Sequence, residues 1–275
     1  MPGKDATLPG FTEISPNNLM RLIGGPSTPM IVDVSLDADF DADPHLVPTA
    51  FRHPHTDLDR LTALAQGRSV VVICQKGLKL SHGVAAALRA RGIAAQILEG
   101  GNYGWRDATL PRVPAHAVPG LAMGATRWVT RHRPKIDRIA CPWLIRRFVD
   151  PQAEFLFVPP SAVEGVAERF NATPFDIEGG EWSHNGPLCT FDTMIDRFGL
   201  AHEALNRVAV VVRAADTDTS DLSPQAAGLL AISVGLSRLH KDDTTQLNAG
   251  LAIYDALYRW ARDGFDEGHD WPAKK

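Results

Sequence analysis

Cysteine is scarce in this sequence, with three residues in 275: Cys74, Cys141 and Cys189. An odd, sparse set without CxxC spacing argues against a disulfide framework and a thiol-rich zinc site, and favours a reducing, cytoplasmic location. A run of about 18 uninterrupted apolar residues is also absent, so no transmembrane helix is expected. The first eleven residues, MPGKDATLPGF, contain one Lys and no apolar segment, so a secretory signal is not expected.

A large excess of charge is likewise missing. The net charge of −4 and the isoelectric point near 6.2 give no overall attraction to nucleic acid or anionic membrane, and neither is expected as a partner. The hydrophobic fraction of 44% and the charged fraction of 22% are those of an ordinary globular protein. At 275 residues the chain can form one large domain or two small ones, and its oligomeric state is not indicated.

The pattern of the chain changes near residue 115. Residues 1–113 alternate short strands with helices, which predicts an α/β domain with an open, doubly wound parallel sheet and flanking helices. Residues 114–126 collect Pro, Gly and Ala without periodicity and are predicted to be a linker. Helical periods dominate residues 127–275, which predicts a mainly α (α+β) domain with short strands at 154–158 and 174–178.

Capping residues mark several expected helix starts. Ser15 before Pro16 predicts a helix that runs through Leu22, and Asp57 predicts a second one. In the C-terminal half, Ser223-Pro224 predicts a helix to about residue 239, and a long last helix is expected to begin near Asp242 or Asp243.

Cys74 directly follows the apolar run 69–73, which is typical of a central parallel strand. Such a strand delivers the thiol to the carboxyl edge of the sheet, where ligands bind in open α/β folds. The next six residues lead into a helix N-terminus, whose amides and dipole suit an anion; they are Gln75, Lys76, Gly77, Leu78, Lys79 and Leu80. Lys76, Lys79 and the helix dipole favour the thiolate form of Cys74. The thiolate itself can carry sulfur as a persulfide, and this sulfur transfer needs no cofactor. The alternative is a buried structural cysteine.

Polar residues of the C-terminal half offer a second candidate site. Glu181 and His184, together with Asp137 and Asp216, could hold a divalent metal, which would be the only cofactor of the chain. Glycines and an Asn-Gly-Pro turn flank residues 181–184, so this segment is expected to be a loop. The alternative is a surface glutamate beside a hydrogen-bonded histidine. The basic run 131–138 is interpreted as a solvated face, with an oxyanion or nucleic-acid contact as its alternative.

Three segments of the N-terminal part resemble the rhodanese family in order and spacing. They are Ile31-Val32-Asp33-Val34, Cys74-Gln75-Lys76-Gly77 and Leu98-Glu99-Gly100-Gly101-Asn102-Tyr103-Gly104-Trp105. The resemblance covers residues 12–112. It implies that Cys74 is the persulfide-forming nucleophile, that residues 75–80 are the active-site loop, and that the partners are a small sulfur donor or oxyanion and a thiol acceptor.

This sequence departs from the rhodanese pattern at three places. Ser35 stands where the family often has Arg, and residues 44–50 replace the usual Gly-His-Ile-Pro-Gly-Ala turn. The loop after Cys74 is longer than the common form by one or two residues and lacks its Arg-Ser. A longer loop favours a bulkier tetrahedral oxyanion than the common form accepts.

The C-terminal part resembles the C-terminal domain of the chromate-resistance protein ChrB, from about residue 127 to 262. The segments that carry this resemblance are residues 133–148, 174–176, 181–184, 189–192, 213–216 and 221–230. The resemblance implies a role in bacterial chromate resistance, without a defined catalytic mechanism. Together the two resemblances predict a rhodanese-type sulfurtransferase fused to a chromate-resistance domain. The alternatives are a non-enzymatic oxyanion or redox sensor and a metal-dependent enzyme in the C-terminal domain.

Overall fold

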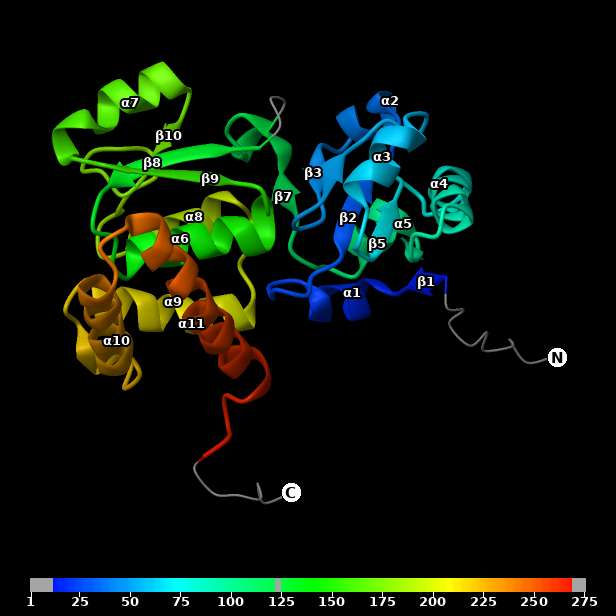
Figure 1. Ribbon diagram of the computed structural model, residues 1–275. Helices are drawn as coiled ribbons and strands as arrows, with labels where there is room; N and C mark the ends of the chain where they lie inside the picture. Colours follow the sequence, from blue (N-terminus) through cyan, green and yellow to red (C-terminus); the bar gives the residue numbers. More distant parts are fainter. Residues whose placement is uncertain (1–11, 122–124, 269–275) are drawn as a thin grey trace. The chain divides into compact units, whose positions relative to one another are not determined.

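The computed structural model describes residues 12–121 and 125–268. The chain divides into two compact units, Met1–His116 and Ala117–Lys275, whose elements are drawn in Figure 1. The beginning of the predicted linker is structured, because Pro114 belongs to strand β7 (Val113–Pro114) and Ala115–Ala117 forms a short 3₁₀ helix. Residues 122–124 of that linker and residues 1–11, on which the expectation about a secretory signal rests, lie outside the described residues.

None of the helices in the described part of the chain combines the length and the apolar character that crossing a membrane requires.

The first unit contains a five-stranded parallel sheet of order β1-β6-β5-β2-β4. Its strands are β1 (Glu13–Ile14), β2 (Met30–Asp33), β4 (Phe51–Arg52), β5 (Val70–Ile73) and β6 (Ala95–Leu98). A separate antiparallel pair joins β3 (His45–Leu46) to β7. The predicted α/β fold with an open parallel sheet is confirmed, with β5 at its centre.

Five helices connect these strands: α1 (Pro16–Leu22), α2 (Asp37–Asp41), α3 (Leu58–Leu64), α4 (Lys79–Ala90) and α5 (Gly101–Asp107). The predicted caps are confirmed. Ser15 Oγ accepts a hydrogen bond from the Asn18 amide (3.4 Å), and Asp57 Oδ1 accepts one from the Arg60 amide (3.2 Å). Each cap satisfies a first-turn amide that the helix leaves without an intrahelical partner.

One apolar cluster joins every second residue of the central strands to the inner faces of α3 and α4. Its buried members are Met30, Val32, Val34, Leu61, Ala65, Val70, Val72, Cys74, Val84, Ala85, Leu88, Ile93, Ala95 and Ile97. Cys74 belongs to this cluster, so close packing fixes the position of its side chain.

Thr49 lies in the replaced turn, at the left-handed φ of 66°. A β-branched residue rarely adopts this conformation, and Thr49 Oγ1 is buried without a hydrogen-bond partner in the described structure. The departure of this turn from the rhodanese pattern therefore carries a conformational cost.

Gly101→Ala tests the closest backbone approach of the first unit. At Gly101 (φ +59°) an added Cβ would lie 2.0 Å from the Cys74 carbonyl oxygen and 2.3 Å from the Gly77 amide nitrogen. The substitution is expected to lower the free energy of unfolding by about 2–3 kcal/mol. Gly83→Ala is the control, because it adds a methyl to α4 with nothing within 4 Å and is expected to raise that free energy by about 0.5–1 kcal/mol. Urea unfolding followed by circular dichroism measures both, and equal midpoints would contradict this account.

The second unit has a three-stranded parallel sheet of order β10-β8-β9. The strands are β8 (Arg127–Arg131), β9 (Glu154–Val158) and β10 (Thr173–Pro174). Strand β9 confirms the strand predicted at 154–158, whereas β10 covers residues 173–174 instead of the predicted 174–178. Helix α7 (Val163–Phe170), preceded by the 3₁₀ helix Pro160–Ala162, packs on one face of this sheet through Val129, Val163 and Ala172. Figure 1 shows α6 and α8 on the opposite face.

The remaining helices form the larger part of this unit, as predicted. They are α6 (Asp137–Leu144) with its π-helical extension Ile145–Val149, α8 (Thr190–Arg197), α9 (Glu203–Asp216), the 3₁₀ helix Ser220–Leu222, α10 (Ala226–Leu239) and α11 (Asp243–Asp263). Asp242 Oδ1 accepts a hydrogen bond from the Thr245 amide (2.7 Å) and caps α11, as predicted. Ser223 is not the cap of α10; its hydroxyl donates to Gln225 Oε1 (2.7 Å) instead.

Two aromatic clusters hold these layers together. Trp128 on β8 meets Phe175, Trp182 and Phe198, and the last two rings stack with centroids 4.8 Å apart. In the other cluster, the rings around Trp143 on α6 are Phe148, Phe191, Tyr254 and Tyr258. The indole of Trp143 also donates a hydrogen bond to Asp255 (2.8 Å), so that its polar edge is satisfied within the core.

His202 is the titratable member of the second cluster. Its ring packs against Phe148 and Tyr258, and its nitrogens meet the Leu200 carbonyl (2.8 Å) and the Tyr258 hydroxyl (3.1 Å). Burial and the positive charge of Arg262 lower the pKa of His202 below its ordinary value, although the hydrogen bond to the Leu200 carbonyl acts in the opposite direction.

As the pH falls, His202 therefore takes up a proton in the unfolded chain at a higher pH than in the folded chain. This contribution to stability is complete above about pH 6.5, the ordinary value for histidine, and is lost as pH falls toward the lower folded pKa. His202→Gln is expected to be less stable than the parent at pH 8 but to lose less stability between pH 7 and pH 5.5. Urea unfolding at each pH measures the difference, and parallel losses in both proteins would contradict the assignment.

Candidate functional sites

Cys74 lies directly after β5, at the carboxyl edge of the first sheet, and is 5% exposed. Its thiol donates a hydrogen bond to the Ser81 hydroxyl (3.2 Å), which in turn donates to the Leu78 carbonyl (3.0 Å). Ser81 is on the first turn of α4, so the thiol is held against the start of this helix. The structure thus places Cys74 where the sequence predicted it.

The loop after Cys74 is anchored through its backbone. The Cys74 carbonyl accepts hydrogen bonds from the amides of Gly77 (3.3 Å) and Asn102 (3.1 Å), and the Gln75 carbonyl accepts one from Tyr103 (3.0 Å). Gly77 has a φ of +65°, and an added Cβ there would lie 2.6 Å from the Gly101 amide nitrogen. The loop can pass this close to α5 only because both positions are glycine.

The remaining loop residues face outward. The side chains of Lys76, Leu78 and Lys79 are exposed, while Gln75 and Leu80 are half-buried, with Gln75 donating to the Asp39 carbonyl (3.0 Å). Helix α4 begins at Lys79 without a side-chain cap, so its first-turn amides remain available for an anion.

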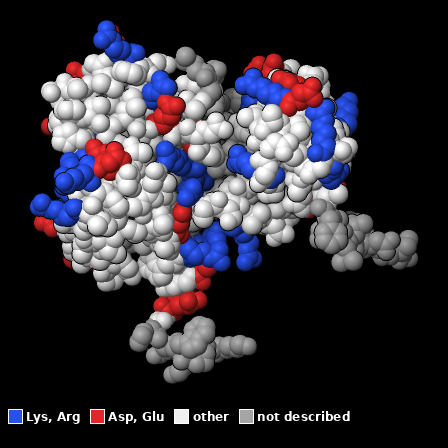
Figure 2. Space-filling model, in the orientation of Figure 1, with Lys and Arg blue, Asp and Glu red and all other residues white. Residues whose placement is uncertain are grey.

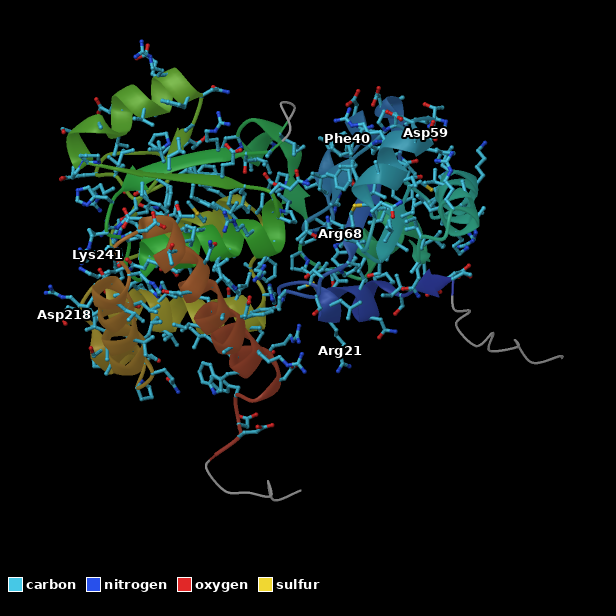
Figure 3. The ribbon with its side chains drawn as sticks, viewed as in Figure 1. Arg21, Phe40, Asp59, Arg68, Asp218 and Lys241 are labelled. Carbon is cyan, nitrogen blue, oxygen red and sulfur yellow. The ribbon has the colours of Figure 1, made fainter. Side chains whose placement is uncertain are left out.

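Asp33 fixes the neighbouring strand end. Its buried carboxylate accepts hydrogen bonds from the Ser35 amide (2.8 Å) and hydroxyl (2.5 Å) and from the Asn102 side chain (2.8 Å). Ser35, the residue that stands in place of the family's frequent Arg, is therefore occupied in holding Asp33. Arg52 on β4 donates to the Ser35 carbonyl (3.0 Å) and stacks over Phe40 of α2, which is labelled in Figure 3.

The second site brings together residues that are far apart in the sequence. Asp137 is the first residue of α6, Asp216 is the last residue of α9, and His184 lies in the loop before α8. One ligand atom from each of these three side chains lies within 4.8 Å of the other two. Asp218, two residues beyond Asp216, lies at the surface (Figure 3).

The Nε2 atom of His184 lies at the centre of this cluster. It is 3.3 Å from Asp216 Oδ2, 3.5 Å from Asp176 Oδ1 and 3.6 Å from Asp137 Oδ2. The loop that carries His184 is held by its neighbour Trp182, whose carbonyl accepts the Asp176 amide (2.8 Å). As predicted, residues 181–184 form a loop, which is followed by an isolated bridge between Asn185 and Leu188.

The structure does not bring Glu181 into the cluster. Its side chain is 67% exposed and pairs with Arg197 (2.6 Å). Because the segment is not helical, the three-residue spacing from Glu181 to His184 does not place the two side chains on one face. Asp176, which the sequence did not indicate, lies beside His184 in this cluster. The sequence signal that could indicate Asp176 is its position two residues after the short strand β10, and its φ of 53° turns the chain there.

Asp176 also binds two arginines of the basic run 131–138. Arg131 Nη2 donates to its Oδ2 (3.0 Å), Arg138 Nε lies 3.3 Å from the same oxygen, and Thr190 Oγ1 donates to its Oδ1 (3.1 Å). Arg133 donates to the Ser237 carbonyl (2.8 Å). These arginines therefore make contacts within the unit. Figure 2 shows basic and acidic side chains mixed in small groups on the visible face of each unit.

Burial sets the electrostatics of the cluster. Asp137 is 2% exposed and accepts hydrogen bonds from the backbone amides of Thr190 (2.7 Å) and Phe191 (3.1 Å). Burial and the charges of Asp216 and Asp176 raise the pKa of Asp137 well above its ordinary range. The hydrogen bonds from the two amides lower this pKa but do not cancel the rise. Burial and the Asp176 charge also raise the pKa of Asp216, although His184 and the Asp137 amide oppose the shift.

The other two cysteines are buried near this site. Cys141 Sγ lies 3.8 Å from Asp137 Oδ1, and Cys189 shares a capping box with Asp192 at the start of α8. Burial and the Asp137 charge raise the pKa of both thiols above the ordinary value. Since the thiolate is the reactive form, both are expected to be inert in the folded protein.

Alkylation tests this expectation. In a short iodoacetamide pulse at pH 7.5, Cys141 and Cys189 of the folded protein should be labelled at least about tenfold more slowly than in urea, because both thiols are buried and protonated. Peptide mass mapping of each pulse measures the labelling site by site. Rapid labelling of Cys189 in the folded protein would contradict the structure.

Known proteins with similarity to this chain match only part of it. Residues 128–261 match the family described as "ChrB, C-terminal domain". Protein ChrB of Cupriavidus metallidurans is 33% identical over 135 residues, which are 48% of this chain. The aligned part covers 40% of that relative's length.

Three chains of solved structures are similar to part of this chain. A rhodanese-related protein from Thermoplasma volcanium is 20% identical, with 37% of this chain and 97% of that chain covered and a TM-score of 0.33. A rhodanese-like domain protein from Staphylococcus aureus is 27% identical, with coverages of 34% and 90% and a TM-score of 0.31. Thiosulfate sulfurtransferase from Pseudomonas aeruginosa is 25% identical, with coverages of 38% and 19% and a TM-score of 0.33.

In the N-terminal part, the parallel sheet by itself establishes the α/β fold. The resemblance of the C-terminal part is confirmed by the family match and by the identity to a curated ChrB protein. Residues 128–261 of this chain are thus similar to the ChrB C-terminal domain family.

Proposed function

We propose that this chain is a cytoplasmic sulfurtransferase that acts in bacterial tolerance of chromate or related oxyanions, with Cys74 as the sulfur carrier. The observation that carries the proposal is the position of Cys74, at the carboxyl end of the central strand and against the uncapped first turn of α4. A nucleophilic sulfur beside free amides suits a donor that leaves as an oxyanion. The ChrB-type domain in the same chain supports the link to chromate.

The reaction needs two displacement steps. The Cys74 thiolate attacks the outer sulfur of a donor such as thiosulfate, forming a persulfide while the S–S bond of the donor breaks and sulfite leaves. A thiol or cyanide acceptor then takes the outer sulfur and regenerates the thiolate. Ser81 assists the thiolate, because its hydroxyl can turn from the Leu78 carbonyl toward the charged sulfur.

The loop residues have separate parts in this proposal. The first-turn amides of α4 and the ammonium groups of Lys76 and Lys79 stabilise the donor oxyanion. The backbone contacts of Gly77 keep the loop in position, and the exposed Leu78 offers an apolar contact to the acceptor. Gln75 fixes the loop to α2 through the Asp39 carbonyl.

Sulfur transfer to cyanide tests the proposal, with thiosulfate and 3-mercaptopyruvate as donors. Cys74→Ser is expected to lose at least about a thousandfold in kcat/KM, because the nucleophile is removed. Intact mass should show the gain of one sulfur atom on the wild-type chain after donor alone and none on Cys74→Ser.

Cys189→Ser is the matched control, since it removes a buried thiol of the second unit and should leave sulfur transfer unchanged. Absence of both turnover and persulfide with either donor would overturn the proposal. Equal activity of Cys74→Ser and wild type would assign the reaction to another group.

A further inference from the structure

The cluster around His184 has a charge balance that the protein side chains leave incomplete. Three carboxylates, from Asp137, Asp176 and Asp216, lie within 3.6 Å of one imidazole nitrogen. Arg131 and Arg138 form ion pairs with Asp176, whereas Asp137 and Asp216 form ion pairs only with His184 among the residues that the structure describes. The charge of Arg138 acts on Asp216 from a greater distance. Two carboxylates at a largely buried position thus share one half-exposed imidazole.

The spacing of the donor atoms suits a metal ion. Two ligand atoms bound about 2.1 Å from one tetrahedral ion lie about 3.4 Å apart. The distances from His184 Nε2 to Asp216 Oδ2 (3.3 Å) and to Asp137 Oδ2 (3.6 Å) bracket this value. The three side chains come from α6, α9 and the loop before α8, and each position is fixed by its own packing or hydrogen bonds.

The donor set selects a class of ion. Carboxylate oxygens and one imidazole suit Mn²⁺, Fe²⁺ and Zn²⁺, whereas a soft ion such as Cu⁺ prefers thiolates. Cys141 contacts Asp137 only at 3.8 Å and is not part of the three-residue group. Asp176 is also outside that group, because its carboxylate is held by Arg131, Arg138 and Thr190.

We propose that Asp137, His184 and Asp216 bind one divalent first-row metal ion. Three protein ligands leave at least one coordination position open, as in catalytic metal sites. The opening lies on the side of His184 and Asp216, whose side chains are 39% and 19% exposed, while the Asp137 side chain is 2% exposed. The site takes water or a small oxyanion there, independently of the sulfur chemistry at Cys74.

Mn²⁺ binding to the untagged full-length protein tests this proposal. After removal of metals with EDTA and dialysis, Mn²⁺ is titrated and the free ion is followed by its electron paramagnetic resonance signal. Mn²⁺ is the chosen probe because it prefers oxygen and nitrogen donors, so the three thiols do not compete. The expected result is one tightly bound ion per chain, with Zn²⁺ competing for the same position.

The variants locate the site. His184→Ala and Asp216→Asn should each weaken Mn²⁺ binding at least about tenfold, because each removes a ligand. Glu181→Ala is the matched control, since it alters the same loop at a residue that pairs with Arg197, and it should bind as the wild type does. Cys74→Ser should also bind normally, which separates this proposal from the sulfurtransferase proposal.

A second measurement covers variants that fold poorly. Mn²⁺ should raise the thermal midpoint of the wild type and of Glu181→Ala but not that of His184→Ala or Asp216→Asn, because only an ion bound to the folded state stabilises it. Circular dichroism verifies the fold of each variant. Binding below one ion per chain, or binding that is unchanged in both ligand variants, would overturn the metal site and leave His184 as the counter-ion of three carboxylates.

Discussion

The buried carboxylate of Asp137 is the constraint on which the second unit depends. It begins α6, accepts the first amides of α8 through Thr190 and Phe191, and its own amide is bonded to Asp216 at the end of α9. Two helix N-termini and one helix C-terminus therefore meet at a single acidic residue, and the positive ends of the two helices offset the charge that burial disfavours. The placement of His184 against this point follows from the aromatic packing of Trp182.

The first unit depends on contacts between backbone atoms at glycines. Gly77 and Gly101 meet at a distance that no side chain permits, and this contact joins the loop after Cys74 to the start of α5. The surroundings of Cys74 are thus formed by two segments that leave the same edge of the sheet, one after β5 and one after β6. In both units, a candidate functional residue stands at the end of a regular element whose other residues are fixed by a core.

The regular elements of the chain could be predicted because their signals are local. The Ser15 and Asp57 caps, the apolar run of β5 and the long period of α11 each express one pattern in one segment. Two-residue strands such as β1 and β4 are too short to show a period, and β7 pairs with β3, a strand distant in sequence. The candidate metal site was predicted in part: Asp137, His184 and Asp216 were chosen by residue type. The structure places Glu181 outside the cluster and Asp176 beside His184, because the arrangement depends on a loop whose path is set by tertiary contacts.

Each unit has its own hydrophobic core, around Val72 in the first and around Val129 in the second. Cooperativity is a property of such a core, so the chain is expected to melt in two transitions rather than as one all-or-none event. Damage to one core then leaves the other domain folded within the same polypeptide. Because the proposed thiol site lies in one half of the chain and the acidic cluster in the other, this modularity lets substitutions alter the two sites separately.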